Sequence, residues 1–278
     1  MNQREPQEDA FTPADDAIAR HREELKKRFP MPSPSKPEPR SRTRLGVAMA
    51  MLGFACGLIW LDPAYRTEHF SSVIGKHESI QLADGSHVTL DAASRIRVSW
   101  HLRSRQVELQ QGQALFSVAP AVYRPFLTIA GATRITVVGT RYNVNRSQQD
   151  VRVTVEEGRV DVGGSEADVR LHAGDQILVR NGRLGMPVRI DASASSAWTN
   201  GRLVFDRTPL REVLEVVQRH RSGSVIIQDQ SLNELPVSGA FDSDRLDGML
   251  TLLPKILPVE LSRDADGTLY LNRRASRK

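Results

Sequence analysis

Cysteine pairs and recognisable catalytic motifs are the main absences from this sequence. The one cysteine, Cys56, has no partner within the chain, so no intrachain disulfide can form. Seven histidines occur, but none stands in the H-E-x-x-H spacing of zinc enzymes, and there is no C-x-x-C pair. The G-x-S-x-G elbow of hydrolases and a phosphate-binding loop are also absent. We therefore expect no catalytic residue, no metal site and no cofactor, and a protein that is not an enzyme.

The chain as a whole also lacks a large net charge of either sign. The formal net charge is +5, and much of the positive excess stands before residues 45–61 and in the basic tail of residues 273–278. Basic residues beside an apolar run are typical of membrane topology, and a short basic tail is usually solvated. We therefore do not expect nucleic acid as a partner.

Residues 42–63 read RTRLGVAMAMLGFACGLIWLDP, and within this stretch residues 45–61 carry no charged side chain. A helix over this run would be about 25 Å long, which is at the short end of what crosses a bilayer. Arg44 and Trp60 suit the two membrane interfaces. The long segment before the run and the lack of an A-x-A site after it disfavour a signal peptide, and the lack of a polar stripe disfavours a core helix. We predict a single transmembrane helix over residues 45–61 and keep the other two interpretations as alternatives.

The orientation of this helix follows from the basic residues around it. Seven lysines and arginines between residues 26 and 44 precede the run, and few follow it. Basic segments stay on the cytoplasmic side. We therefore expect a bacterial inner-membrane protein with a cytoplasmic N-terminus and the C-terminal bulk in the periplasm.

A short helix is expected in the cytoplasmic residues 1–30. Thr12 can cap it and Pro13 suits its first position. An apolar stripe then recurs near a heptad spacing and consists of Phe11, Ile18, Leu25 and Phe29. A single short helix cannot bury such a stripe by itself, so the segment either frays or binds a partner. Residues 31–44, rich in proline and basic residues, are expected to be an extended linker.

Alternating strands are predicted over residues 76–190, after a periplasmic linker at residues 62–75. Apolar and polar residues alternate in SIQLADGSHVTL, RQVELQQGQALFSVA, TRITVVGTRYNVN and VRVTVEEGRVDV. Four strand ends lead into a glycine, where a positive φ favours a tight turn: Gly85, Gly112, Gly158 and Gly174. We expect an all-β domain of the β-roll or solenoid-like kind.

A change of period marks a small α+β domain over residues 201–272, after a linker at residues 191–200. The predicted order is β-α-β-β-α-β-β, with a helix entered through Thr208 and Pro209 and a second helix ended by Pro254. A final hairpin is expected around Asp266-Gly267. Trp198, just before this domain, is expected to fill the joint between the two domains.

Several of these motifs, in this order, resemble the FecR family of transmembrane anti-sigma regulators. They are LADGSHVTLDAASRIRV, RQVELQQGQALFSVA, FLTIAGATRITVVGTRYNV, VTVEEGRVDV and LHAGDQ, followed by AWTNGRLVFDRTPLREVLEVVQRH at the passage into the C-terminal domain. The C-terminal domain resembles the STN signalling domain shared by secretins and TonB-dependent transducers.

The resemblance implies a relay in cell-surface signalling that regulates transcription of iron-transport genes. The C-terminal domain would dock on the signalling domain of a TonB-dependent outer-membrane transducer. The cytoplasmic segment would bind an extracytoplasmic-function sigma factor, and the candidate contacts are then the residues of the apolar stripe, Phe11, Ile18, Leu25 and Phe29. Periplasmic and intramembrane proteases would then cleave the chain and release the sigma factor. The family's cytoplasmic region is longer and bears tryptophan, whereas no tryptophan precedes Trp60 here.

Candidate transducer contacts are Pro236, Val237, Ser238, Leu246 and Leu250. Pro236 cannot donate a hydrogen bond to a neighbouring strand, which favours an edge strand that accepts a strand from a partner. Leu246 and Leu250 either face the transducer or pack their helix onto its own sheet.

A second class of function stays open from the sequence. The chain is alternatively a membrane-anchored periplasmic scaffold or envelope-binding protein without sigma-factor activity. The sequence does not distinguish inhibition from activation of a sigma factor.

Overall fold

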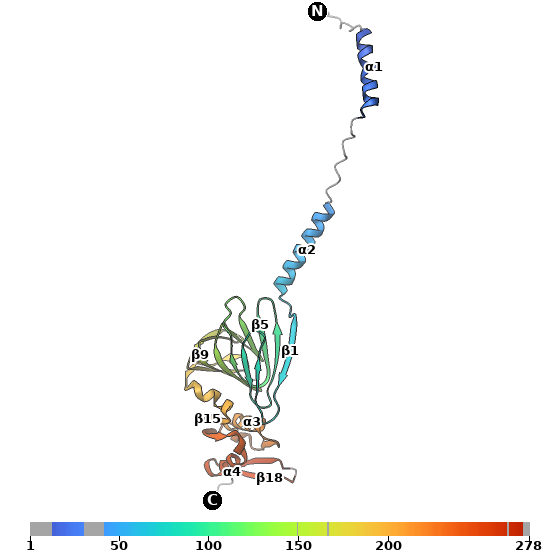
Figure 1. Cartoon of the computed structure of the whole chain (residues 1–278). Coiled ribbons are helices and arrows are strands. Elements are labelled where there is room, and N and C mark those ends of the chain that lie inside the picture. Colours follow the sequence, from blue (N-terminus) through green and yellow to red (C-terminus); the bar gives the residue numbers. More distant parts are fainter. Residues whose placement is uncertain (1–12, 31–41, 149, 166, 266, 275–278) are drawn as a thin grey trace, which may run out of the picture. The chain divides into compact units, whose positions relative to one another are not determined.

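The computed structural model describes residues 13–30, 42–148, 150–165, 167–265 and 267–274 (Figure 1). The chain divides into two compact units, residues 1–58 and 59–278, which are described separately here as the N-terminal unit and the folded unit. Two helices begin in the N-terminal unit: α1 (Pro13–Arg28) and α2 (Arg42–Leu61). The helix predicted within residues 1–30 is confirmed as α1, whereas Phe11 and Thr12 lie outside the described residues.

Helix α2 covers the whole apolar run of residues 45–61. Within the described part of the chain, no helix reaches the length and apolar character that a membrane crossing requires.

Fourteen strands form the β domain at the start of the folded unit. They are β1 (Arg66–Ser71), β2 (Glu78–Gln81), β3 (His87–Leu90), β4 (Arg95–Trp100), β5 (Arg105–Ser117), β6 (Phe126–Ala130), β7 (Thr133–Val137), β8 (Arg141–Ser147), β9 (Asp150–Glu157), β10 (Arg159–Gly163), β11 (Asp168–His172), β12 (Asp175–Arg180), β13 (Arg183–Leu184) and β14 (Val188–Arg189). The expectation of a mostly β domain is confirmed.

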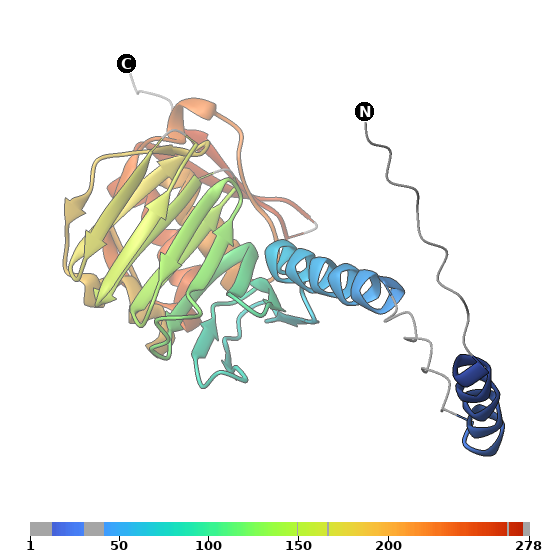
Figure 2. The ribbon, with the colours of Figure 1, turned by 90° about the horizontal axis from the view of Figure 1, so that it is seen from above.

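The strands are arranged in two layers that share β5. The first half of β5 belongs to the series β1-β4-β5-β6-β7-β10-β11, and its second half joins β2, β3, β8, β9 and β12. Buried side chains from both layers form one hydrophobic core. Figure 2 shows the ribbon of these strands from above. Alternation of apolar and polar residues along most strands is therefore explained by one face packed inward and one face in water. Strand β8 and the second half of β5 are instead buried at consecutive positions, so both of their faces are covered.

Gly112 is the point at which β5 passes from one layer to the other. Its φ is +85°, and a Cβ atom there would lie 2.8 Å from the Cα of Ser94. The Ser94 hydroxyl accepts a hydrogen bond from the backbone N–H of Gln113. The predicted positive φ is confirmed, but Gly112 lies inside a long strand and not at a strand end.

Two sequence expectations about this domain are wrong. Residues 62–75 contain β1, which pairs with β4 over its whole length, so the segment is not only a linker. The strands are mostly antiparallel in two layers and do not form the parallel turns of a solenoid. The stretch VRVTVEEGRVDV explains the error, because β9 pairs with β8 and β12 whereas β10 pairs with β7 and β11. Gly158 thus sends the chain to the opposite layer instead of closing a hairpin.

The C-terminal module is the rest of the folded unit from residue 202. Its elements are β15 (Arg202–Pro209), α3 (Leu210–His220), β16 (Val225–Ile227), β17 (Pro236–Asp242), α4 (Leu246–Ile256), β18 (Val259–Arg263) and β19 (Leu269–Arg273), with 3-10 turns η2 (Gln230–Leu232) and η3 (Ser243–Arg245). The predicted order of strands and helices is confirmed. Strand β15 pairs with β17, and β16, β19 and β18 form a second sheet.

Both predicted proline boundaries in the module differ from the structure. Pro209 ends β15 and precedes α3 as its cap residue, with no side-chain cap bond from Thr208. Pro254 lies inside α4, which continues to Ile256. A proline near the last turn removes one backbone hydrogen bond, and the bond from the Leu257 N–H to the Leu253 carbonyl completes the helix end.

Candidate functional site

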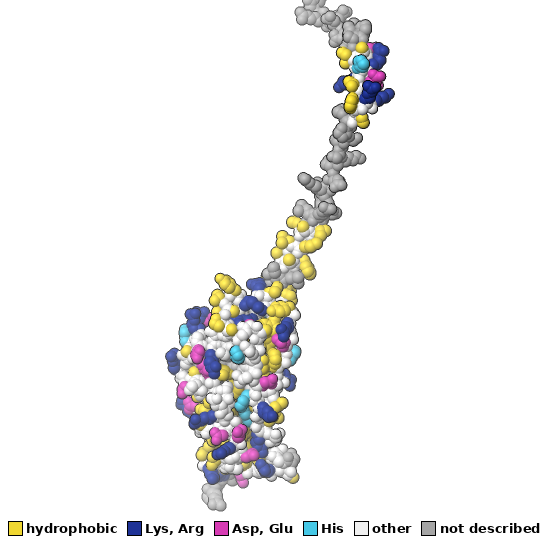
Figure 3. All heavy atoms as spheres, viewed as in Figure 1, with side chains coloured by type: hydrophobic (Ala, Val, Ile, Leu, Met, Phe, Trp, Pro, Cys, Tyr) yellow, Lys and Arg dark blue, Asp and Glu magenta, His cyan; other side chains and the backbone are white. Residues whose placement is uncertain are grey.

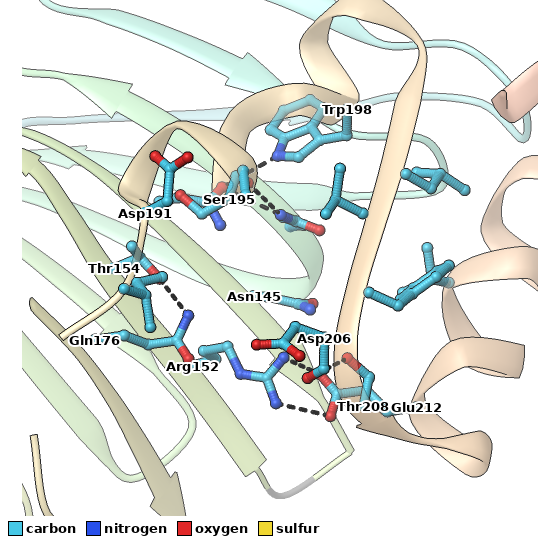
Figure 4. Close-up of a pocket in the computed structure, with 18 of the residues that line it drawn as sticks. Asn145, Arg152, Thr154, Gln176, Asp191, Ser195, Trp198, Asp206, Thr208 and Glu212 are labelled. Carbon is cyan, nitrogen blue, oxygen red and sulfur yellow. Dashed lines mark hydrogen bonds and ion pairs between the residues drawn. The ribbon is translucent and has the colours of Figure 1, made fainter. Parts of the chain in front are cut away.

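Several buried polar side chains lie at the junction between the β domain and the C-terminal module, among them Asn145, Thr154 and Glu212 (Figure 4). The linker predicted at residues 191–200 is here the 3-10 helix η1 (Ala192–Asn200). Trp198 is buried in η1, and its Nε1 donates a hydrogen bond to Oδ1 of Asn143 at 3.3 Å. The prediction that Trp198 fills the joint is confirmed.

Helix α3 has two buried faces of different character. Its apolar face consists of Leu210, Val213, Leu214 and Val217, which belong to the core of the C-terminal module. The second face carries Glu212, Glu215 and Arg219, which are spaced at i, i+3 and i+7 and so lie on one side of the helix.

The polar face of α3 contacts strands β8 and β9. Nη1 of Arg152 lies 2.7 Å from Oε1 of Glu212, and both side chains are largely buried. Ser147 donates a hydrogen bond to Glu215. Nη1 of Arg219 donates to Oδ1 of Asn145 at 3.2 Å. The helix is therefore held to the β domain by charged groups that are paired across the junction.

A buried pair closes one end of this junction. Nε2 of His220 lies 3.0 Å from Oδ1 of Asp91, and both side chains are almost completely removed from water. Removal from water lowers the pKa of the neighbouring Arg219, and the carboxylates of Asp91, Glu215 and Glu212 oppose that shift. The Asp91–His220 pair thus lies where the end of α3 reaches the β3–β4 turn, next to the buried cation of Arg219.

A cavity of about 280 Å³ lies beside these contacts. Side-chain amides from Gln113, Asn143, Asn145 and Gln176 line it together with Trp198 and the Arg152–Glu212 pair. Figure 4 shows Gln176 bonded to Thr154, and Gln113 donates to Asn143 at 3.2 Å. Gln113 and Asn143 are thus bonded to each other, and Gln176 and Asn145 are bonded to Thr154 and Arg219. Among the described residues there is no group of three His, Cys, Asp or Glu side chains that could hold a metal ion.

The predicted sigma-factor contacts lie on α1 and directly after it. Ile18, Leu25 and Phe29 each expose more than half of their side-chain surface. Phe11 lies outside the described residues. Within the described chain the apolar stripe of α1 is therefore not covered.

The predicted transducer contacts separate into two groups. Val237, Leu246 and Leu250 are buried in the core of the C-terminal module, so a partner cannot touch their side chains, and this part of the prediction is wrong. The apolar face of α4 packs onto the module itself. Pro236 and Ser238 are exposed on β17, which pairs with β15 alone among the described strands.

The two predicted membrane-flanking residues lie in α2. Trp60 is exposed in the last turn of α2, and Arg44 lies in its first turn.

The junction residues Asp91, His220, Glu212, Glu215 and Arg219 were not predicted from the sequence. The charged series on α3 gave no distinctive signal, because a charged face opposite the apolar face is normal for an amphipathic helix. Asp91 and His220 gave no signal because they are far apart in the sequence and meet only in the fold.

Comparisons with known proteins agree with this architecture. The model of the FecR protein family matches residues 65–161, and the model of the FecR C-terminal domain matches residues 202–270. Two crystal structures of a candidate anti-sigma factor from Parabacteroides distasonis, at 1.65 and 2.50 Å resolution, are similar to this chain with a TM-score of 0.69 and 25% identity. They cover 75% and 76% of this chain and 100% of their own. No curated protein matches the sequence.

Proposed function

Because this chain belongs to the FecR family, we propose that it regulates a sigma factor, which it binds through helix α1. The observation that supports this proposal is the uncovered apolar stripe of α1, in a unit separate from the folded β domain and C-terminal module. A regulator of this kind needs one segment that binds the sigma factor and another that receives the signal. The N-terminal unit and the folded unit are suited to these two roles.

Helix α1 has the properties of a helix that binds in a groove. Ile18, Leu25 and Phe29 follow one another at intervals of seven and four residues, so they lie near one face. A helix of 16 residues is only marginally stable alone in water. Burying one such side chain stabilises a complex by about 1.5–3 kcal/mol, so the stripe is sufficient for a specific contact. The proposed partner is an extracytoplasmic-function sigma factor.

The folded unit is proposed as the part that receives the signal in the periplasm. We propose that residues 45–61 cross the inner membrane, as the uncharged run and its basic N-terminal flank indicate. The STN-like C-terminal module is proposed to dock on the signalling domain of a TonB-dependent outer-membrane transducer. The exposed Pro236 and Ser238 on edge strand β17 favour docking by strand addition.

The proposed consequence of docking is release of the sigma factor by periplasmic and intramembrane proteolysis, with transcription of iron-uptake genes as the output. Deletion of the gene tests this output. The abundance of transcripts from the iron-uptake operons should differ between the deletion strain and the parent strain. The size of this difference should depend on whether the cells grow in low or high iron. If no operon responds to the deletion, the regulator proposal is wrong.

Sigma-factor binding is tested by substitutions in the stripe of α1. Ile18→Asp with Leu25→Asp should weaken binding of the sigma factor by about 100-fold or more, because two buried apolar side chains together contribute about 3–6 kcal/mol. Co-purification of the full chain with the sigma factor, followed by titration, measures the change.

A matched control uses the opposite face of the same helix. Arg20→Gln with Lys27→Gln changes two residues about half a turn away from Ile18 and Leu25. This control should bind as tightly as the parent chain. Equal binding by the aspartate variant and the control would show that α1 is not the sigma-binding element.

A further inference from the structure

One end of the β domain exposes apolar side chains from two separate loops. Leu102 lies in the β4–β5 turn and is 61% exposed, and Val122 and Tyr123 lie in the β5–β6 connection and are 74% and 97% exposed. Single exposed apolar residues are normal on soluble proteins. These three, which we call the apolar tip, lie at the same end because Arg105 and Phe126, the first residues of β5 and β6, are paired neighbours in parallel strands.

The two loops of the apolar tip are bonded to each other. Nη2 of Arg124 donates to the carbonyl of His101 at 2.6 Å and lies 3.4 Å from the Tyr65 hydroxyl. The N–H of Tyr65 in turn donates to the Trp100 carbonyl. The tip is therefore one surface to which three segments of the chain contribute.

A buried arginine holds the second loop in place. Nη1 of Arg105 lies 2.5 Å from Oδ2 of Asp84 and donates to the Ala119 carbonyl at 3.0 Å. Its Nε donates to the Arg124 carbonyl at 2.9 Å. The backbone on both sides of Val122 and Tyr123 is thus fixed, and these side chains cannot fold back onto the domain without breaking bonds to a buried cation.

The apolar tip is also joined to the end of the apolar run. The carbonyl of Asp62 lies 2.5 Å from Nδ1 of His101, and its Oδ1 accepts a hydrogen bond from the backbone N–H of Arg103 at 3.0 Å. Leu61, the last residue of α2, directly precedes Asp62 in the chain. Covalent continuity therefore keeps the end of the apolar run within a residue of the Leu102 loop, whatever direction the rest of α2 takes.

We propose that the apolar tip is a membrane-seating face, whose occupant is the surface of a bilayer containing anionic phospholipid. Tyr123, like Trp60, is an amphipathic ring of the kind that favours the headgroup region. The Arg103 side chain is exposed beside Leu102, makes no ion pair with the described residues and can pair with lipid phosphate. The carboxylate of Asp62 accepts hydrogen bonds from the β4–β5 turn.

This face has a consequence for the orientation of the folded unit. Figure 3 shows exposed hydrophobic side chains at the upper end of the β domain, and Figure 1 shows the C-terminal module at its lower end. A β domain seated on its tip therefore holds the C-terminal module away from the lipid, where a partner can reach the free edge of β17. The inference rests on the proposed membrane crossing of residues 45–61.

The test uses the full chain reconstituted into vesicles of phosphatidylethanolamine and phosphatidylglycerol that contain a brominated phospholipid. An environment-sensitive fluorophore is attached at a single cysteine. Tyr123→Cys, in a Cys56→Ala background, reports the tip, and Ile256→Cys on α4 is the matched control, an exposed apolar residue of the C-terminal module. Native Cys56 reports the proposed crossing.

The expected result is a blue-shifted and quenched fluorophore at position 123, at least twofold more quenched than at position 256, with Cys56 quenched as well. Quenching at Cys56 together with equal, weak quenching at positions 123 and 256 would overturn the membrane-seating face and leave the crossing intact. No quenching at Cys56 would overturn the crossing and the inference with it. Tyr123 is almost fully exposed, so its replacement removes no packing that the fold requires.

Discussion

At the scale of single residues, Arg105 is the cation on which the β domain depends most clearly. It is buried, lies over the Phe126 ring, and bonds to the carboxylate of Asp84. Burial alone would raise the pKa of Asp84, but hydrogen bonds from Ser86 and Arg105 outweigh that effect and hold the pKa below its ordinary value of 3.8. Asp84 is therefore ionised in the folded protein at every physiological pH.

Asp84→Asn should reveal a pH-dependent part of the stability. The carboxylate has a lower pKa in the folded chain than in the unfolded chain, so its stabilisation is complete above the unfolded value and is lost as pH falls through the folded value. Removing one partner of a buried ion pair costs about 3–5 kcal/mol, and the two carbonyls that still bond to Arg105 place this case near the lower figure. Urea unfolding should therefore show a large difference between variant and parent at neutral pH.

The same difference should shrink below about pH 4, where the parent loses its carboxylate as well. A difference that stayed constant from neutral to acidic pH would show that the charge of Asp84 does not contribute.

Gly112→Ala should be more damaging than the same substitution at Gly85. Both glycines have a φ near +85°, which costs a non-glycine residue about 1–3 kcal/mol. An added Cβ at Gly112 would also collide with Ser94, whereas at Gly85 nothing lies within 4 Å. Thermal unfolding should therefore give a lower midpoint for Gly112→Ala, and Gly85→Ala isolates the backbone cost. Equal midpoints would mean that the strand crossing at Gly112 relaxes without cost.

At the scale of elements, α3 joins the two halves of the folded unit through its second face. One side packs into the module with apolar residues, and the other meets the β domain through Glu212, Glu215 and Arg219. A partly buried charge without its partner is costly, so these pairs specify one docking position for the module.

A charge exchange tests the docking of α3. Arg152→Glu and Glu212→Arg should each loosen the junction because like charges then face each other, and limited proteolysis should cut sooner within residues 191–200. The double variant restores an opposite pair and should regain most of the resistance. If the double variant is cut as fast as the single ones, the Arg152–Glu212 pair does not hold the junction.

At the scale of the whole molecule, the chain consists of a small helical unit and a larger folded unit. Within the folded unit, η1 and the buried Trp198 replace a flexible linker between the β domain and the C-terminal module. A partner that docks on the module therefore acts on the β domain as well.

The proposed topology predicts the activity of enzyme fusions. Alkaline phosphatase folds to an active form only outside the cytoplasm, so fusion after residue 100 should be active and fusion after residue 30 inactive. The second fusion is the control, since it ends before residues 45–61. An inactive fusion at residue 100 with normal expression would contradict the crossing.

Much of the secondary structure was predictable, because it depends on local pattern. The order of elements in the C-terminal module, helix α1 and the glycines with positive φ all follow from periodicity and turn chemistry over a few residues. The strand β1 was missed because RTEHFS alternates only weakly between apolar and polar residues. The sequence does not distinguish an apolar residue that packs in its own core from one that contacts a partner. For this reason three core residues were predicted as partner contacts: Val237, Leu246 and Leu250.

The sequence by itself determined the α1 stripe, the uncharged run of residues 45–61, the alternating strands and the family resemblance. All of these are properties of residues close together in the chain. Only the tertiary structure decided that β5 serves two layers, that Asp91 meets His220, and that the loops of Leu102 and Tyr123 share one end of the domain. The physical reason is that pairing between distant strands is selected by the packing of the whole core, which no short stretch of the sequence contains.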